Sequence, residues 1–252
     1  MKKKAAPFKV LRCTILIFVV LCLCGAGVVT AQGYGMYSRA LAALPTAQAA
    51  GEVRGQAGFT PLENLPDTYL QAVVAAEDHR FYQHGGIDIL AIGRALVRDI
   101  ISLSFDEGGS TITQQLAKNL YFTQEKELSR KVAEVFMAWQ LEADFSKEEL
   151  LELYVNSIYF GSGCYTVGDA SREYFDCEPG QMTDFQATLL AGIPNAPSVY
   201  DLNENPDLAQ QRQRQVVGLM VKYCEGLDQD WADSVLGQSS TRESEVALCA
   251  GN

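Results

Sequence analysis

Apolar side chains recur every three to four residues through most of the chain, which is the spacing of amphipathic α-helices. The residue-by-residue alternation typical of strands is scarce. Helix starts carry the expected signals: a proline at Pro66, a hydroxyl cap in Ser110-Thr111, and a capping-box spacing from Ser146 to Glu149. Predicted helices begin near Asp67 and cover about residues 112–121, 125–142, 147–156, 184–191 and 207–223. The pattern therefore predicts a mainly α fold.

One stretch is apolar on every face. Cys13 to Ala31 is nineteen residues without a charge, against the roughly 20 residues that a helix needs to cross a bilayer. Basic residues precede this stretch and the first acidic residue is Glu52, so the positive-inside rule places the N-terminus in the cytoplasm and the rest of the chain outside. The alternative is a cleavable signal peptide ending at Ala31, although the apolar core of such a peptide is usually only about 7 to 15 residues long.

This topology divides the chain into five parts. The segment after the apolar stretch is rich in alanine and glycine and is interpreted as a linker. The predicted parts are a cytoplasmic basic tail (1–12), a transmembrane anchor (13–31), the linker (32–58), a folded domain (59–225) and a C-terminal tail (226–252).

The part beyond the anchor is strongly acidic. Five of the 20 basic residues precede the anchor, which leaves 15 against 31 acidic residues and a net charge near −16. Such a surface repels nucleic acid, which is therefore not an expected partner. An anionic substrate would need a local basic cluster or a bridging divalent cation.

Four cysteines lie beyond the anchor: Cys164, Cys177, Cys224 and Cys249. Four cysteines can pair in three ways, and the sequence alone does not choose among them. Pairing of nearest neighbours would join Cys164 to Cys177 and Cys224 to Cys249. The alternative is that all four remain thiols.

A carboxylate interrupts one of the apolar stripes. Leu70, Val73 and Val74 share one face of the first predicted helix, and the next position on that face is Glu77. Because burial disfavours the charged form of a carboxylate, we expect the pKa of Glu77 to be raised toward the range useful for proton transfer near neutral pH. Both histidines of the chain follow within seven residues, but their spacing is not that of a zinc site.

Two further segments carry groups suited to an anion. Thr111, Gln115 and Lys118 share a face of one predicted helix, and the Gly-Gly-Ser-Thr turn before it offers free backbone N–H groups. Arg130 and Glu134 lie one turn apart on the next helix. Taken singly, these features also fit an ordinary capped helix with a surface lysine and an ion pair worth roughly a few tenths of a kcal/mol.

In their order along the chain, five segments resemble the motifs of glycosyltransferase family 51, the peptidoglycan transglycosylase domain of class A penicillin-binding proteins and of monofunctional transglycosylases. The segments are Glu77-Asp78-x2-Phe81-x2-His84-x-Gly86-x-Asp88, the run from Gly108 to Asn119, Arg130-Lys131-x2-Glu134, Lys147 to Gly163, and Leu189 to Pro197. The resemblance covers about residues 60–223. The run from Gly108 to Asn119 is too specific to arise by chance.

The resemblance implies a fold as well as a reaction. Members of the family have a lysozyme-like helical domain with a small membrane-proximal lobe, preceded here by one N-terminal transmembrane helix. Ile100 to Phe105 is the segment expected to touch the membrane, with a buried core strip as the alternative.

The family polymerises lipid II, a disaccharide-peptide carried on undecaprenyl pyrophosphate, on the outer face of the cytoplasmic membrane. The resemblance implies that Glu77 is the general base for the acceptor 4-hydroxyl, and that the lipid pyrophosphate leaves in one inverting displacement that forms a β-1,4 bond. Lipid II, the growing lipid-linked glycan and the cytoplasmic membrane are the implied partners. Transpeptidases and other cell-wall synthesis proteins are further expected partners.

Other site residues follow from the motif positions. Glu134 matches the second essential carboxylate and is the expected ligand of a divalent cation, Mg2+ or Mn2+, while no organic cofactor is expected. Lys118 and Arg130 are expected to stabilise charge on the departing phosphate. The implied substrate-binding set is Asp78, Phe81, His84, Ser110, Thr111, Gln115, Lys118, Asn119 and Arg130. Within it, the first three also shape and orient the base.

The chain departs from the family pattern just before the fifth motif. Residues 182–188 lack the glutamate that is usual there. The sequence contains no Ser-x-x-Lys motif, so we expect a monofunctional enzyme without a transpeptidase domain. Two alternatives remain open: a lysozyme-like glycan-cleaving enzyme, in which a buried glutamate acts as an acid, and a non-catalytic scaffold for cell-wall assembly.

Overall fold

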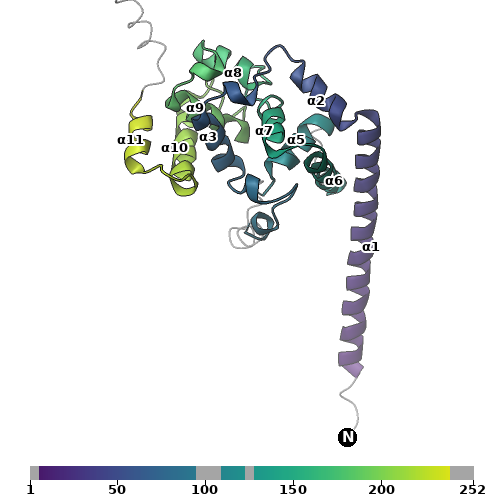
Figure 1. Ribbon diagram of the computed structural model, residues 1–252. Helices are drawn as coiled ribbons and strands as arrows, with labels where there is room; N and C mark the ends of the chain where they lie inside the picture. Colours follow the sequence, from purple (N-terminus) through teal and green to yellow (C-terminus); the bar gives the residue numbers. More distant parts are fainter. Residues whose placement is uncertain (1–5, 95–108, 123–127, 239–252) are drawn as a thin grey trace, which may run out of the picture.

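The computed structural model describes residues 6–94, 109–122 and 128–238, which contain helices and no strand. The α-helices are α1 (Ala6–Ala43), α2 (Thr46–Arg54), α3 (Asp67–Glu77), α5 (Ile112–Tyr121), α6 (Leu128–Asp144), α7 (Lys147–Val155), α8 (Val167–Phe175), α9 (Asp184–Gly192), α10 (Pro206–Tyr223) and α11 (Gln229–Leu236) (Figure 1). Short 3-10 helices are η1 (Leu62–Asn64), η2 (Phe81–Gln83), η3 (Pro179–Gln181) and η4 (Ile193–Asn195). The prediction of a mainly α fold is confirmed.

Two predicted helix starts have the expected capping geometry. Thr111 accepts a hydrogen bond from the backbone N–H of Gln114, whose side chain accepts one from the backbone N–H of Thr111. Ser146 and Glu149 form the same reciprocal pair at the start of α7. A cap of this kind contributes about 0.5 to 2 kcal/mol, because it satisfies backbone donors that the first turn leaves free.

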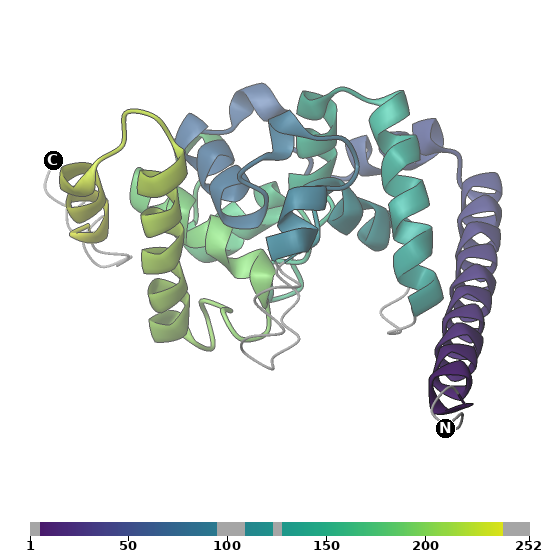
Figure 2. The same ribbon diagram turned by 90° about the horizontal axis from the view of Figure 1, so that it is seen from below.

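The core is built around α3. This helix packs against α9 and α10, and α5 packs against α6 and α7. Figure 2 shows α10 beside α3, with α6 and α1 on the other side of the molecule. Tyr69 of α3, Tyr154 of α7 and Phe81 after α3 are among the largest fully buried side chains. This packing fixes the C-terminal end of α3, where Glu77 lies.

Helix α1 is longer than the predicted anchor and includes part of the predicted linker. Its 38 residues correspond to about 57 Å, almost twice the roughly 30 Å of a bilayer core. By length and composition, Leu11–Ala43 could cross a membrane. The first part of α1 projects from the domain, whereas its last turns run beside α6 (Figure 1).

A glycine allows the close contact between α1 and α6. A Cβ atom at Gly33 would lie 2.7 Å from the backbone oxygen of Ser129 and from the side chain of Val132. Four residues later, Tyr37 donates its hydroxyl to Oε1 of Gln140 at 3.0 Å. The small residues interpreted as a linker are thus contact residues of a packed helix, and α2 occupies much of what remains of that segment.

Helix α11 lies within the predicted C-terminal tail, and α8 was likewise not predicted. Asp228 caps α11 by accepting the backbone N–H of Trp231 at 2.9 Å. Ala232 and Val235 are buried against Val217 of α10. This segment is a short amphipathic helix, but its many acidic and polar residues obscure the apolar pattern in the sequence.

Cys164, Cys177 and Cys224 are thiols, so the disulfide expected from nearest-neighbour pairing of Cys164 and Cys177 is absent. Cys249 and the predicted membrane-touching segment from Ile100 to Phe105 lie outside the described residues.

Candidate active site

A cavity of about 340 Å³ lies at the end of α3, between the start of α5 and the end of α10. Glu77 and Asp78 line it at the end of α3, Ser110 and Thr111 at the start of α5, and Tyr223 from α10. The fold therefore brings the predicted base and the predicted anion-binding turn to one cavity, although they are far apart in the sequence.

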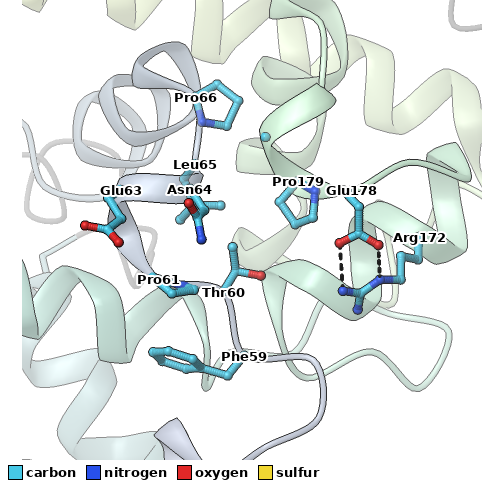
Figure 3. Close-up of a pocket in the computed structure, with 11 residues that line it drawn as sticks. Phe59, Thr60, Pro61, Glu63, Asn64, Leu65, Pro66, Arg172, Glu178 and Pro179 are labelled. Atoms are coloured by element: carbon cyan, nitrogen blue, oxygen red, sulfur yellow. Dashed lines mark hydrogen bonds and ion pairs between the residues drawn. The ribbon is translucent and has the colours of Figure 1, made fainter.

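A second cavity, of about 490 Å³, lies between residues 59–66 and the segment that follows α8 (Figure 3). Three charged side chains line it: Glu63, Arg172 and Glu178. Arg172 and Glu178 point toward each other and are joined by two hydrogen bonds of 2.9 Å. These two charges neutralise each other, and none of the predicted catalytic residues lines this cavity. The candidate active site is therefore the cavity at Glu77.

A relay of two hydrogen bonds, from Tyr154 to Gln115 and from Gln115 to Glu77, orients the Glu77 carboxylate. The side chain of Glu77, the last residue of α3, is 7% exposed. Gln115 of α5 donates from Nε2 to Oε2 of Glu77 at 2.8 Å. Tyr154 of α7 donates its hydroxyl to Oε1 of Gln115 at 3.1 Å. The carboxylate is thus held through two neighbouring helices.

The pKa of Glu77 is raised above the ordinary value of a glutamate, chiefly because burial removes water from the carboxylate. The hydrogen bond from Gln115 and the charges of Arg212 and Lys118 lower this pKa, while Asp78 raises it. The direction agrees with the expectation from the apolar stripe. A raised pKa suits a group that takes up a proton near neutral pH.

Asp78, His84 and Thr111 connect the loop after α3 to the start of α5. Asp78 accepts hydrogen bonds from Nε2 of His84 at 2.9 Å and from the backbone N–H of Ile112 at 3.2 Å. Thr111 donates its hydroxyl to the backbone oxygen of Gly86 at 2.8 Å. These contacts fix the position of Glu77 relative to the turn that precedes α5.

Phe81 is not placed to bind substrate, contrary to the expectation from its motif position. It is fully buried, and Nζ of Lys147 lies 4.3 Å from the centre of its ring, a cation–π geometry. Phe81 therefore anchors the loop after Glu77 in the core. Of the two polar residues at the end of the second motif, Asn119 is exposed, whereas Lys118 is half-buried and its charge acts on Glu77.

Glu134 is buried on α6 between two cations. Nη1 of Arg130 lies 3.1 Å from Oε1 of Glu134, and Nζ of Lys131 lies 2.9 Å from Oε2. Lys131 also donates to Oγ of Ser110, which lines the Glu77 cavity, at 2.6 Å. The third motif thus reaches the cavity through Lys131, for which the sequence suggested no separate role.

The surroundings of Glu134 do not fit the expected divalent cation. Both carboxylate oxygens already pair with cations, whereas Mg2+ or Mn2+ prefers several oxygen ligands. Among the described residues, Asp78, His84 and Asp88 also bring ligand atoms within 4.8 Å of one another. There His84 bonds to Asp78, and Nε of Arg80 lies 3.5 Å from Asp88. Side chains of the protein already occupy both groups, so we assign no metal ligand.

Two residues of α10 that were not predicted lie at the site: Arg212 faces the Glu77 carboxylate, and Tyr223 lines the cavity. Nη2 of Arg212 lies 4.0 Å from Oε1 of Glu77. Tyr223 stacks on His79 with ring centres 4.0 Å apart, and both residues line the cavity. For Arg212 the available signal was the one that singled out Glu77: a charge on an apolar stripe, which Val216 continues one turn later.

Helices packed around a buried glutamate, with basic side chains beside it, are the arrangement of a lysozyme-like transglycosylase domain. The family model described as transglycosylase matches residues 46–221, which is more than half of the chain. The chain belongs to this family, as its motifs indicated.

Several penicillin-binding proteins are similar to this chain. Penicillin-binding protein 1F of Bacillus subtilis strain 168 is 45% identical over 159 residues, covering 63% of this chain and 22% of the relative. Penicillin-binding protein 1A of Neisseria lactamica is 42% identical over 172 residues, covering 68% of this chain and 21% of the relative. The chain therefore spans about a fifth of the length of these curated relatives.

Proposed function

We propose that this chain is a peptidoglycan glycosyltransferase that polymerises lipid II into β-1,4-linked glycan strands. The observation that carries the proposal is the buried carboxylate of Glu77, which has a raised pKa and lies in a cavity at the start of α5. Membership of the transglycosylase family and the similarity to penicillin-binding proteins support the same conclusion.

In the proposed reaction, the carboxylate of Glu77 takes the proton of the 4-hydroxyl of the acceptor sugar. That oxygen forms a bond to the anomeric carbon of the donor, while the bond from this carbon to the pyrophosphate oxygen breaks. The bonding electrons leave with the lipid pyrophosphate, whose negative charge is stabilised by Lys118, Arg130 and Lys131. One displacement inverts the anomeric centre, so an α-linked donor gives a β-linked product.

The proposal includes a location. The apolar stretch of α1 and the basic residues before it favour an anchor whose N-terminus is cytoplasmic and whose catalytic domain faces outward. In that orientation the cavity can reach a lipid-linked donor and acceptor in the outer leaflet. Protease added to intact spheroplasts should then digest the part beyond α1; full protection of that part would contradict the orientation.

Polymerisation and cleavage have different products. The purified full chain is expected to convert labelled lipid II into long glycan strands and to release no soluble muropeptides from preformed peptidoglycan. Because Arg130 and Lys131 pair with Glu134 in place of a metal ion, the polymerisation rate is expected to stay near its original value when EDTA is added. Muropeptide release without polymer would favour the glycan-cleaving alternative, and neither product would favour a scaffold.

A further inference from the structure

The side chain of Arg212 reaches the one oxygen of Glu77 that lacks a hydrogen bond. Oε2 of Glu77 accepts from Gln115, whereas the buried Oε1 has no hydrogen-bond partner among the described residues. Nη2 of Arg212 lies 4.0 Å from that Oε1. At this distance the contact is a charge–charge interaction and not a hydrogen bond.

The fold directs Arg212 to this position. The Arg212 side chain is 11% exposed, and its Nη1 donates to Oε1 of Gln215 at 3.1 Å. A Cβ atom at Gly192, the last residue of α9, would lie 3.0 Å from Cγ of Arg212. Glycine at this position therefore leaves room for the arginine stem between α9 and α10. The buried Nε of Arg212 has no hydrogen-bond partner within the described part of the chain, so its placement is not explained by a fully satisfied structural network.

We propose that Arg212 is a positioning residue that keeps the Glu77 carboxylate ionised and ready to accept the acceptor's proton. This inference rests on the proposed function, in which Glu77 must begin the reaction without a proton. A buried carboxylate with no cation beside it would hold a proton and act as an acid, which is the role of the corresponding group in glycan cleavage. Arg212 thus favours the ionised form of Glu77, which acts as a base, over the protonated form, which would act as an acid.

Other charged groups also act on Glu77. Lys118 of α5 is a second cation, the neighbouring Asp78 of α3 opposes both cations, and the buried Tyr154 hydroxyl of α7 is within electrostatic reach. Helix α9 places the uncharged Gly192 beside the Arg212 side chain. Lys118 is expected to act mainly on the departing pyrophosphate. Arg212 is then the cation that acts mainly on the Glu77 carboxylate.

The test is the pH dependence of lipid II polymerisation by the full chain. Because the base must be deprotonated, the rate falls as the pH drops through the pKa of Glu77. Arg212→Gln removes the cation, so the acid limb of the profile should move upward by about 1 to 3 pH units. Arg212→Lys should keep the limb near its wild-type position. Arg214→Gln, an exposed position on the same helix, should leave the profile unchanged.

A second variant displaces the arginine without removing its charge. Gly192→Ala should crowd the Arg212 stem and move the acid limb in the same direction by a smaller amount. A role limited to folding would lower the rate equally at every pH, and a role limited to substrate binding would raise KM with the limb unmoved; either result overturns the assignment. Absence of polymer from the wild-type chain would overturn the proposed function and this role together, whereas active Arg212→Gln with an unmoved limb would overturn the role alone.

Discussion

At the residue scale, the site depends on one carboxylate whose environment is set by neighbours from three other helices. Gln115 of α5 and Arg212 of α10 contact Glu77 directly, and Tyr154 of α7 acts on it through its hydrogen bond to Gln115. The sequence predicted Glu77 and Gln115, because each lies on a helical face with a recognisable pattern. Tyr154 could not be assigned in this way. Arg212 also interrupts an apolar stripe, but its partner could not be predicted, since both roles depend on how helices distant in the sequence pack together.

Tyr154→Phe tests the outer hydrogen bond of this series. The variant keeps the fully buried ring and removes only the hydroxyl that donates to Gln115. We expect the free energy of unfolding to fall by about 0.5 to 1.5 kcal/mol, the usual net contribution of such a bond. Denaturant titration measures this change. Tyr165→Phe, whose ring is 58% exposed, is the control; equal stabilities for the two variants would contradict the structural role of the Tyr154 hydroxyl.

At the element scale, α5 and α7 were predicted from their caps, whereas the capped helices α8 and α11 and the helices rich in small residues were not predicted. Thr111 and Ser146 marked α5 and α7, because a cap is a local interaction that the sequence shows directly. The end of α1 and all of α2 were interpreted as a linker, since alanine and glycine carry no amphipathic pattern. Their order comes from tertiary packing against α6 and α7, which a local pattern does not contain.

Gly33→Leu tests whether α1 is a packed part of the domain. The new side chain would meet the backbone of Ser129 and the side chain of Val132, so we expect a loss of about 1 to 3 kcal/mol, as for other overpacked contacts. Thermal unfolding in detergent, followed by the fluorescence of the two tryptophans, reports the loss. Trp139 is a local probe, because its ring lies 5.7 Å from that of Phe136 on α6.

The matched control is Gly27→Leu. Gly27 lies on the same helix, and a Cβ atom at this position would have no other atom within 4 Å. The control therefore gains the same helix propensity without a clash. If both variants unfolded at the same temperature, the last turns of α1 would not be packed on α6 as described.

At the scale of the whole molecule, a series of contacts connects α1 through α6 to the cavity at Glu77. Helix α1 packs on α6, α6 carries Arg130 and Glu134, and Lys131 of the same helix contacts Ser110 at the cavity. Ile89 and Leu90 are apolar and 72% and 58% exposed. The helical segment 89–94 that contains them lies on the side of the domain toward which α1 projects (Figure 1). The proposed lipid-linked substrate would therefore approach from the membrane side.

The central claim, that Glu77 is the base of a glycan polymerase, is tested most directly by lipid II polymerisation with the Glu77→Gln variant. The amide keeps the size of the side chain but cannot take up the proton, so the rate should fall by about 10²- to 10⁴-fold. Glu63→Gln, at an exposed position outside the cavity, should polymerise at the wild-type rate. A folded Glu77→Gln variant that polymerises lipid II as fast as this control would contradict the claim.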